Sequence, residues 1–165
     1  MKKKIPNNFI IDIDGIMTNG NMIYSYKKKE FKIFGPDDND ALKVLSNYIN
    51  IIFITADKRG FAISQKRIEH DMKMKLFLVD GKKRKNILQK KYNLNQSIFM
   101  GDGIFDHLVM KNCLYSITVK DSLEHVRKNA DYIINRVGAN RAVADAAVHI
   151  LKKFFKKSFE KIVNE

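Results

Sequence analysis

The sequence has few cysteines, prolines and glycines and no tryptophan. The single cysteine, Cys113, excludes an intramolecular disulfide and argues against a cysteine-based zinc site. Two prolines and eight glycines exclude collagen-like and low-complexity structure. No apolar run approaches the roughly 20 residues of a membrane span. The composition therefore excludes disulfide-stapled, fibrous and membrane-spanning classes, and it is compatible with a reducing cytoplasm.

The beginning of the sequence also lacks a secretory signal. The cations Lys2 to Lys4 resemble the start of one, but Pro6 and two asparagines interrupt the chain directly after these lysines. The only nearby apolar run contains Asp12 and Asp14, so no hydrophobic signal core forms. We therefore expect a cytoplasmic protein without a membrane partner.

Acidic residues are fewer than basic ones, 18 against 31, which gives a formal net charge of +13. Clustered cations neutralise phosphates, so a basic nucleic-acid-binding module is the non-enzyme alternative. We favour a lysine-rich solvated surface, because the chain is rich in Lys, Asn and Ile together, and such a general composition bias raises the number of lysines throughout the chain. The same field would steer small phosphorylated substrates toward the protein.

Apolar residues make up 45% of the 165 residues and aromatic residues 10%, which is enough for a real core. A chain of this length and content forms one compact domain, so we expect a single domain over residues 1–165. Disorder throughout the chain is excluded by the same apolar content.

Short apolar runs alternate with segments of helical periodicity. We expect buried strands at residues 9–14, 51–55, 76–78, 97–100, 115–119 and 132–134, and a hairpin within residues 22–34. Helices are expected at residues 40–48, 59–73, 85–92, 104–112, 122–129 and 141–163, with Asp121-Ser122 as a helix N-cap. This alternation predicts an α/β fold, a central parallel sheet covered by helices on both faces. The last helix is amphipathic and continues into a C-terminal segment, residues 141–165, that we expect to dock on the core or at a subunit interface.

Two acidic clusters follow predicted strands. Asp12 and Asp14 end the first strand, where alternation places both side chains on one face. Asp102 and Asp106 follow the fourth strand in a Gly-Asp-Gly-x-x-Asp motif, whose glycines allow a sharp turn. Open α/β sheets bind ligands at the carboxyl ends of their strands. Carboxylates converging there are hard oxygen ligands, suited to Mg²⁺.

Candidate phosphate-binding groups lie between these clusters in the sequence. Thr55 ends the second strand, and its hydroxyl with nearby backbone N–H groups, including that of Ala56, can cradle a phosphoryl oxygen. Lys85 begins the next helix, where its ammonium could neutralise a substrate phosphate. A carboxylate nucleophile, magnesium, a hydroxyl and a lysine together describe phosphoryl transfer through an aspartyl-phosphate.

In this order, these motifs resemble the haloacid dehalogenase superfamily of phosphatases over roughly residues 8–151. The strings at residues 14–20, 30–34 and 130–133 are similar to the branch that contains the 3-deoxy-manno-octulosonate 8-phosphate phosphatases. That resemblance implies a three-layer, Rossmann-like fold with a small β-hairpin, residues 17–34, instead of a cap domain. It also implies a homotetramer built through this hairpin and a role in surface-polysaccharide synthesis, either capsule or lipopolysaccharide.

The resemblance assigns a role to each motif residue. Asp12 matches the nucleophile, and Asp14 matches the general acid/base whose backbone carbonyl contacts Mg²⁺. Thr55 matches the phosphate-binding hydroxyl, and Lys85 the phosphate-binding lysine, with Lys83 as an alternative. Asp102 matches the metal ligand, and Asp106 the supporting acid beside it.

Two departures concern the substrate. The octulosonate enzymes read Thr-Gly-Arg-Lys after the second strand, whereas this chain has Asp57 at the arginine position. Near the carboxyl end two further expected arginines are missing, although Arg141 lies one position away. A carboxylate cannot replace a guanidinium that binds a sugar acid. We therefore hypothesise a different sugar phosphate or an amino-alcohol phosphate, with Asp57 either meeting an amine or pairing with Lys58 or Arg59.

The sequence thus predicts a Mg²⁺-dependent phosphomonoesterase. The alternative substrate is 3-deoxy-manno-octulosonate 8-phosphate itself. A phospho-acceptor signalling domain also combines acids, a threonine and a lysine around Mg²⁺. Its acceptor follows a middle strand, however, whereas Asp12 and Asp14 follow the first strand here.

Overall fold

The computed structural model describes residues 4–164. Lys2 and Lys3 of the cationic start and Glu165 of the C-terminal segment lie outside the described residues. The main sheet has six parallel strands in the order β5-β4-β1-β6-β7-β8. These strands are β1 (Asn8–Asp12), β4 (Asn50–Thr55), β5 (Lys75–Leu78), β6 (Ser97–Met100), β7 (Tyr115–Val119) and β8 (Tyr132–Ile134). The predicted α/β fold with a central parallel sheet is confirmed.

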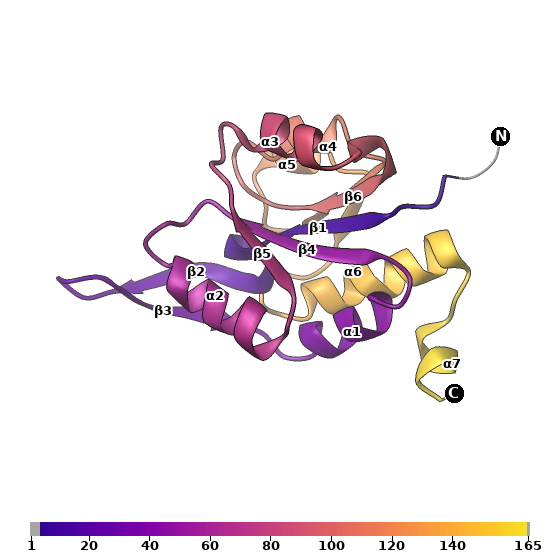
Figure 1. The fold of residues 1–165 in the computed structure, drawn as a ribbon, viewed down its shortest axis with the longest axis horizontal. Coiled ribbons are helices and arrows are strands. Elements are labelled where there is room, and N and C mark those ends of the chain that lie inside the picture. The colour runs from indigo at the N-terminus through magenta and orange to yellow at the C-terminus, as the bar shows by residue number, and fades with distance from the viewer. Residues whose placement is uncertain (1–3, 165) are drawn as a thin grey trace.

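Helices cover both faces of this sheet, which makes three layers (Figure 1). One face carries α1 (Asp38–Leu45), α2 (Phe61–Gln65) with its continuation η2 (Lys66–Asp71), and α6 (Ala142–Ile150). The other face carries α3 (Arg84–Lys91), the short η3 (Leu94–Gln96), α4 (His107–Met110) and α5 (Glu124–Arg127). Successive residues of β1 point to opposite faces: Ile11 packs in the first layer and Ile10 in the second. This two-sided burial explains why the strand is an uninterrupted apolar run.

A separate two-stranded sheet projects from the body to the left in Figure 1. Its antiparallel strands are β2 (Thr18–Tyr24) and β3 (Lys29–Phe34). Along the chain the hairpin lies between β1 and α1, where the sequence predicts an insertion instead of a cap domain. That part of the predicted fold is also confirmed.

The order of the strands places β1 at a topological switch point. After β1 the chain forms β4 and β5 on one side of β1, and it then crosses to form β6, β7 and β8 on the other side. Ligand crevices in open α/β sheets lie outside the carboxyl ends of the strands at such points. A turn follows β1 directly (η1, Ile13–Met17), in which Gly15 has a φ of +90°. A Cβ at Gly15 would lie 2.1 Å from Oδ2 of Asp102, so both the turn and the close approach require glycine.

Several expected helices are shorter than the periodicity predicts. The expected helix at 122–129 is only Glu124–Arg127, and Ser122 does not cap it. The Ser122 hydroxyl instead donates to the Val119 carbonyl oxygen at 2.9 Å. Likewise, the segment after Gly101 stays a turn until His107, because Asp106 accepts a hydrogen bond from the Gly103 backbone N–H at 2.9 Å.

The prediction of one long C-terminal helix over residues 141–163 is wrong. α6 continues through η4 (Leu151–Phe155), Lys156 then adopts a left-handed φ of 58°, and a separate α7 (Phe159–Val163) follows. Phe155 and Phe159 both pack against the core, so the break keeps the apolar side chains of both segments on it. Within residues 4–164, no helix is long and apolar enough to cross a membrane.

Candidate active site

Three carboxylates meet at the carboxyl end of the sheet. Asp12 ends β1, whereas Asp102 and Asp106 lie in the loop after β6. One oxygen from each can be chosen so that all three atoms lie within 4.8 Å of one another. Asp12 and Asp106 are buried, with 4% and 1% of their surface exposed. The structure thus brings together three of the four predicted acids.

A buried arginine lies against this cluster. Arg84, the first residue of α3, places Nη2 at 3.2 Å from Oδ1 of Asp12. Its Nη1 donates a hydrogen bond to Oδ1 of Asp106. The planar guanidinium therefore joins two carboxylates from different strands, a geometry that a lysine ammonium cannot reproduce.

Burial changes the proton affinity of the acids. It raises the pKa of Asp12 to about 7, although the positive charge of Arg84 acts in the opposite direction. Burial, and then the charges of Asp12 and Asp106, raise the pKa of Asp102 to about 8. Burial also raises the pKa of Asp106. Without a further cation, the cluster disfavours having all three carboxylates ionised.

The donor set fits a divalent cation. Oδ1 of Asp102 is buried without a hydrogen-bond partner, a costly state that a metal ion would relieve. One arginine against three carboxylates leaves two negative charges, which a divalent ion would balance. Carboxylate oxygens are the ligands that Mg²⁺ favours. Asp12, Asp102 and Asp106 would hold it, so Asp106 joins the candidate ligands, whereas the side chain of Asp14 lies outside this trio.

Asp14 lies in the turn after Asp12, where it faces a threonine and a lysine. The Thr55 hydroxyl donates to Oδ2 of Asp14 at 2.8 Å and accepts from the Asp57 backbone N–H at 3.0 Å. The predicted phosphate-binding hydroxyl is therefore engaged with the predicted acid/base. Ala56 is exposed beside them and lines the adjacent cavity.

The cation next to Asp12, the predicted nucleophile, is Arg84 and not the predicted lysine. Lys85 is half-buried and Lys83 is exposed, and neither is among the residues that line the cavity. The sequence motifs did not indicate Arg84, because the resemblance implies a lysine at this place. The place of Arg84 in the sequence could have indicated it. Arg84 is the first residue of α3, so its side chain faces the carboxyl ends of the strands.

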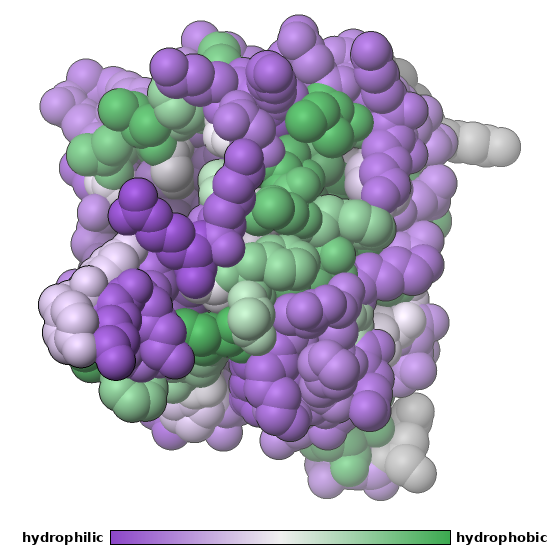
Figure 2. Space-filling model, turned by 60° about the vertical axis from the view of Figure 1, so that its left-hand side comes forward, coloured by the Kyte–Doolittle hydropathy of each residue, from purple (hydrophilic) through white to green (hydrophobic). Residues whose placement is uncertain are grey.

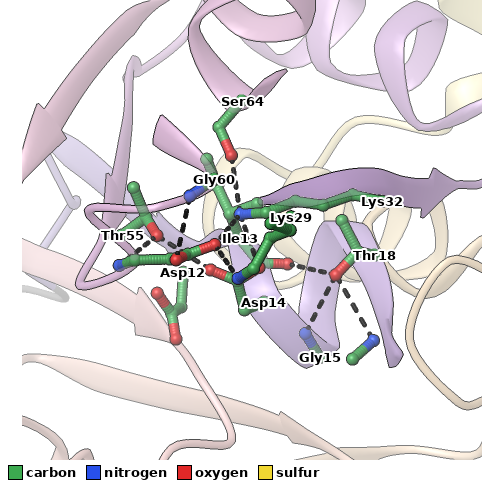
Figure 3. A network of polar contacts seen from close by, with 12 residues as sticks. Asp12, Ile13, Asp14, Gly15, Thr18, Lys29, Lys32, Thr55, Gly60 and Ser64 are labelled. Carbon is green, nitrogen blue, oxygen red and sulfur yellow. Dashed lines mark hydrogen bonds and ion pairs between the residues drawn. The ribbon is translucent and has the colours of Figure 1, made fainter. Parts of the chain in front are cut away.

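Two hairpin lysines enclose Asp57, in a network drawn in Figure 3. Lys29 forms an ion pair with Oδ2 of Asp57, and Lys32 approaches the same atom at 2.9 Å. Both lysine side chains are only 1% exposed. These contacts correct the expectation that Asp57 pairs with Lys58 or Arg59. The hairpin supplies the cations because it folds over the loop that follows β4.

Arg141, the candidate near the carboxyl end, lies elsewhere, as does Asp38, the first residue of α1. Arg141 forms an ion pair with Asp37 and does not line the cavity. Asp38 is buried and accepts from the Ala144 backbone N–H at 2.8 Å, which joins α1 to α6.

A cavity of about 660 Å³ opens next to Asp12. Hairpin residues form one wall and the loop after β6 forms another. Its lining includes Asp14, Met22, Tyr24, Lys29, Asp57, Lys82, Ile104 and Phe105. Figure 2 views this end of the molecule, where apolar surface lies between hydrophilic patches. The cavity is large enough for a small organic phosphate and is partly apolar.

Together, the parallel sheet, the hairpin and the acidic cluster at the switch point form a Rossmann-like α/β fold of the haloacid dehalogenase type, without a cap domain among the described residues. No family model matches the chain. The chain is 27% identical to the 3-deoxy-D-manno-octulosonate 8-phosphate phosphatase KdsC of Haemophilus influenzae, over 96% of this chain and 91% of that protein.

Solved structures agree with this resemblance. A probable YrbI family phosphatase from Pseudomonas syringae superposes with a TM-score of 0.84 at 22% identity, covering 98% of this chain and 92% of the other. A 3-deoxy-D-manno-octulosonate 8-phosphate phosphatase from Moraxella catarrhalis, solved with magnesium, phosphate and KDO, gives 0.80 at 25% identity, over 98% and 93%. The chain therefore resembles haloacid dehalogenase phosphatases of the KdsC type. These relatives are named as phosphatases, and the structure of the Moraxella protein contains magnesium.

Proposed function

We propose that the chain is a Mg²⁺-dependent phosphomonoesterase that forms an aspartyl-phosphate on Asp12 and acts on a small sugar phosphate. The observation that carries this proposal is the meeting of Asp12, Asp102 and Asp106 around Arg84 at the sheet's switch point, beside a cavity.

The residues divide the chemistry between them. Arg84 binds Oδ1 of Asp12 and orients the carboxylate, so that it attacks phosphorus in line with the departing oxygen. Asp14 lines the cavity two residues further on and gives its proton to the leaving alkoxide as the P–O bond breaks. Asp14 then takes a proton from the water that hydrolyses the aspartyl-phosphate. When bound, Mg²⁺ supplies charge neutralisation for the phosphoryl oxygens.

The lining of the cavity bears on the substrate class. The arginine that lines the cavity, Arg84, is already bound to two carboxylates, and Arg141 lies outside the cavity wall. Bidentate recognition of a sugar-acid carboxylate therefore has no free guanidinium among the described lining residues. Lys29 and Lys32 neutralise the Asp57 carboxylate, so this carboxylate offers no unpaired negative charge to a substrate amine. A neutral sugar phosphate of surface-polysaccharide precursor synthesis, for capsule or lipopolysaccharide, is our first candidate.

The test is phosphate release from three kinds of substrate, with and without Mg²⁺. The panel contains neutral sugar phosphates, amino-alcohol phosphates and 3-deoxy-manno-octulosonate 8-phosphate. We expect Mg²⁺-dependent release that Asp12→Asn lowers by at least about a thousandfold, because an amide cannot attack phosphorus. The matched control is Asp40→Asn, at an exposed position of α1 where the carboxylate pairs with exposed Lys43.

The outcomes separate the candidates. Preference for the octulosonate would replace our substrate, and preference for an amine-bearing phosphate would restore the second one. No metal-dependent release from any compound would reject the phosphatase. Salt-sensitive retention on nucleic acid, unaffected by phosphate, would then support the basic binding module.

We also propose that the hairpin assembles the protein into a homotetramer. On the face opposite Lys32, its strands expose the apolar side chains of Ile23, Phe31 and Ile33 to between 48% and 62%. Contiguous exposed apolar surface of this kind is typical of a subunit interface. Light scattering coupled to size-exclusion chromatography should give four chains for the native protein, and a monomer would reject this assembly.

A further inference from the structure

The ammonium group of Lys32 is buried against three acceptors. Its Nζ lies 2.7 Å from Oδ1 of Asp14, 2.9 Å from Oδ2 of Asp57 and 2.9 Å from the Ser64 hydroxyl oxygen. A lysine ammonium has three N–H donors and no acceptor, so these partners account for all of them. Lys32 is the fourth residue of β3, whereas its partners come from three other segments (Figure 3). The hairpin is therefore joined to the acid/base through one side chain.

Asp57 holds Lys32 in this position. Its Oδ2 meets both hairpin lysines, and its Oδ1 accepts from the Gly60 backbone N–H at 3.0 Å. A Cβ at Gly60 would lie 2.2 Å from Oδ2 of Asp57 and 2.6 Å from Cε of Lys32. The absence of a side chain at Gly60 therefore makes room in the loop after β4 for the methylene groups of the lysine side chains. Hydrogen bonds from Lys29 and Lys32 lower the pKa of Asp57 to about 2, although burial alone would raise it.

Both oxygens of the Asp14 carboxylate are consequently fixed. Lys32 binds Oδ1 from one side, and the Thr55 hydroxyl binds Oδ2 at 2.8 Å from the other. Two contacts on different oxygens prevent rotation of the carboxylate plane. Each carboxylate oxygen has two lone pairs, so an oxygen still has room to carry a proton toward the cavity, which Asp14 lines.

We propose that Lys32, held by Asp57, is a positioning residue that orients the Asp14 carboxylate toward the leaving oxygen of the substrate. The inference rests on the proposed phosphatase function and adds to it a residue from the hairpin. A general acid acts only when its proton lies within hydrogen-bond reach of the departing atom. Lys32 does not line the cavity, whereas Asp14 does, so its effect would fall on protonation of the leaving group and not on attack by Asp12.

Leaving-group dependence tests this role. Aryl phosphates with an electron-withdrawing ring lose a stable phenolate that needs no proton, whereas alkyl phosphates lose a basic alkoxide that does. We would measure kcat and KM for p-nitrophenyl, phenyl and benzyl phosphate at saturating Mg²⁺. The proteins compared would be native, Lys32→Met, Lys32→Arg, Asp57→Asn and, as a benchmark, Asp14→Asn. The matched control is Lys28→Met, on the same hairpin but 72% exposed and paired with Glu30 at 3.6 Å.

We expect Lys32→Met to lower kcat for benzyl phosphate by about tenfold to a hundredfold and that for p-nitrophenyl phosphate by less than about threefold. Asp57→Asn should show the same graded loss, and Lys32→Arg should restore part of it. Mg²⁺-induced thermal stabilisation, which does not depend on turnover, should be unchanged in each Lys32 variant.

Equal losses for all three esters, or none, would overturn the positioning role while leaving the phosphatase intact. Native protein inactive on every ester would instead refute the proposed function, and the inference with it. Should Lys32→Met fail to fold, Asp57→Asn decides the question, because it leaves Lys32 in place and weakens the ion pairs that Asp57 makes with Lys32 and Lys29.

Discussion

Replacing Arg84 should damage the protein far more than replacing its neighbour Lys85. Arg84→Met removes the guanidinium that joins Asp12 to Asp106 and leaves both carboxylates buried. Removing one partner of a buried ion pair costs about 3–5 kcal/mol, because the other charge stays desolvated. For a chain of this size, 3 kcal/mol corresponds to a fall in Tm of about 6–12 °C.

Activity should fall with stability at this position. Arg84 binds Asp12, the proposed nucleophile, and loss of one preorganised charge-stabilising group lowers kcat by about a hundredfold to a thousandfold. Arg84→Lys should recover part of this, since an ammonium restores the charge but not the bidentate geometry. Lys85→Met should change kcat by less than about threefold, because Lys85 does not line the cavity.

The assay combines p-nitrophenyl phosphate turnover with thermal unfolding in EDTA at pH 5 and pH 8. Without Arg84, the pKa values of Asp12 and Asp106 rise further above their usual range, so the destabilisation should be larger at pH 8 than at pH 5. The reasoning would be refuted if Lys85→Met abolished turnover while Arg84→Met stayed active and stable. That result would return the phosphate-binding role to the lysine.

Three further predictions concern the metal, pH and the packing of the site. Mg²⁺ at 100 times its Kd should stabilise the native chain by about 2.7 kcal/mol, measured by thermal unfolding. Asp102→Asn should remove most of this Mg²⁺-induced stabilisation, and an undiminished stabilisation would exclude Asp102 as a ligand. Burial raises the pKa of Asp38 from 3.8 to about 6, so the protonated carboxyl group contributes stability that is complete below pH 4 and is lost as pH rises through 6. The free energy of unfolding should fall by up to about 3 kcal/mol over this range. Asp38→Asn should flatten this part of the plot of unfolding free energy against pH, whereas an unchanged plot would assign the loss to another group. Gly138→Ala would place a Cβ 2.1 Å from the Gly15 carbonyl oxygen and should lower Tm and turnover together, while normal values for both would show that the turn can move aside.

Much of the fold could be predicted from local patterns. The apolar run before Asp12 has its side chains buried on both faces, so its composition alone marks it as a central strand. The alternation of strands and helices then restricted the topology, because parallel strands need crossovers. The end of the long terminal helix could not be predicted in this way. Its periodicity continues past Lys156, and only the docking of Phe159 on the core explains the break.

The site was predictable where a residue's role follows from its place at a strand end. Asp12, Asp102 and Asp106 converge because parallel strands share one edge. The partners of Asp57 were not predictable. Lys29 and Lys32 lie more than twenty residues away, on a hairpin whose orientation depends on tertiary packing. Among many lysines, nothing local distinguishes these two from solvated ones.

The central position of β1 affects the order in which the site can form during synthesis. Asp12 precedes the rest of the site along the chain, yet β1 pairs with residues 50–54 on one side and 97–100 on the other. The turn after β1 is completed later still, when the Ala139 backbone N–H donates to the Ile16 carbonyl oxygen at 3.1 Å and Gly138 packs against Gly15. Contacts this distant in sequence form slowly and require most of the chain. A ribosome-bound chain that ends before residue 138 would therefore carry Asp12, the proposed nucleophile, without a finished site, and the site could be completed only after Gly138 and Ala139 have been added.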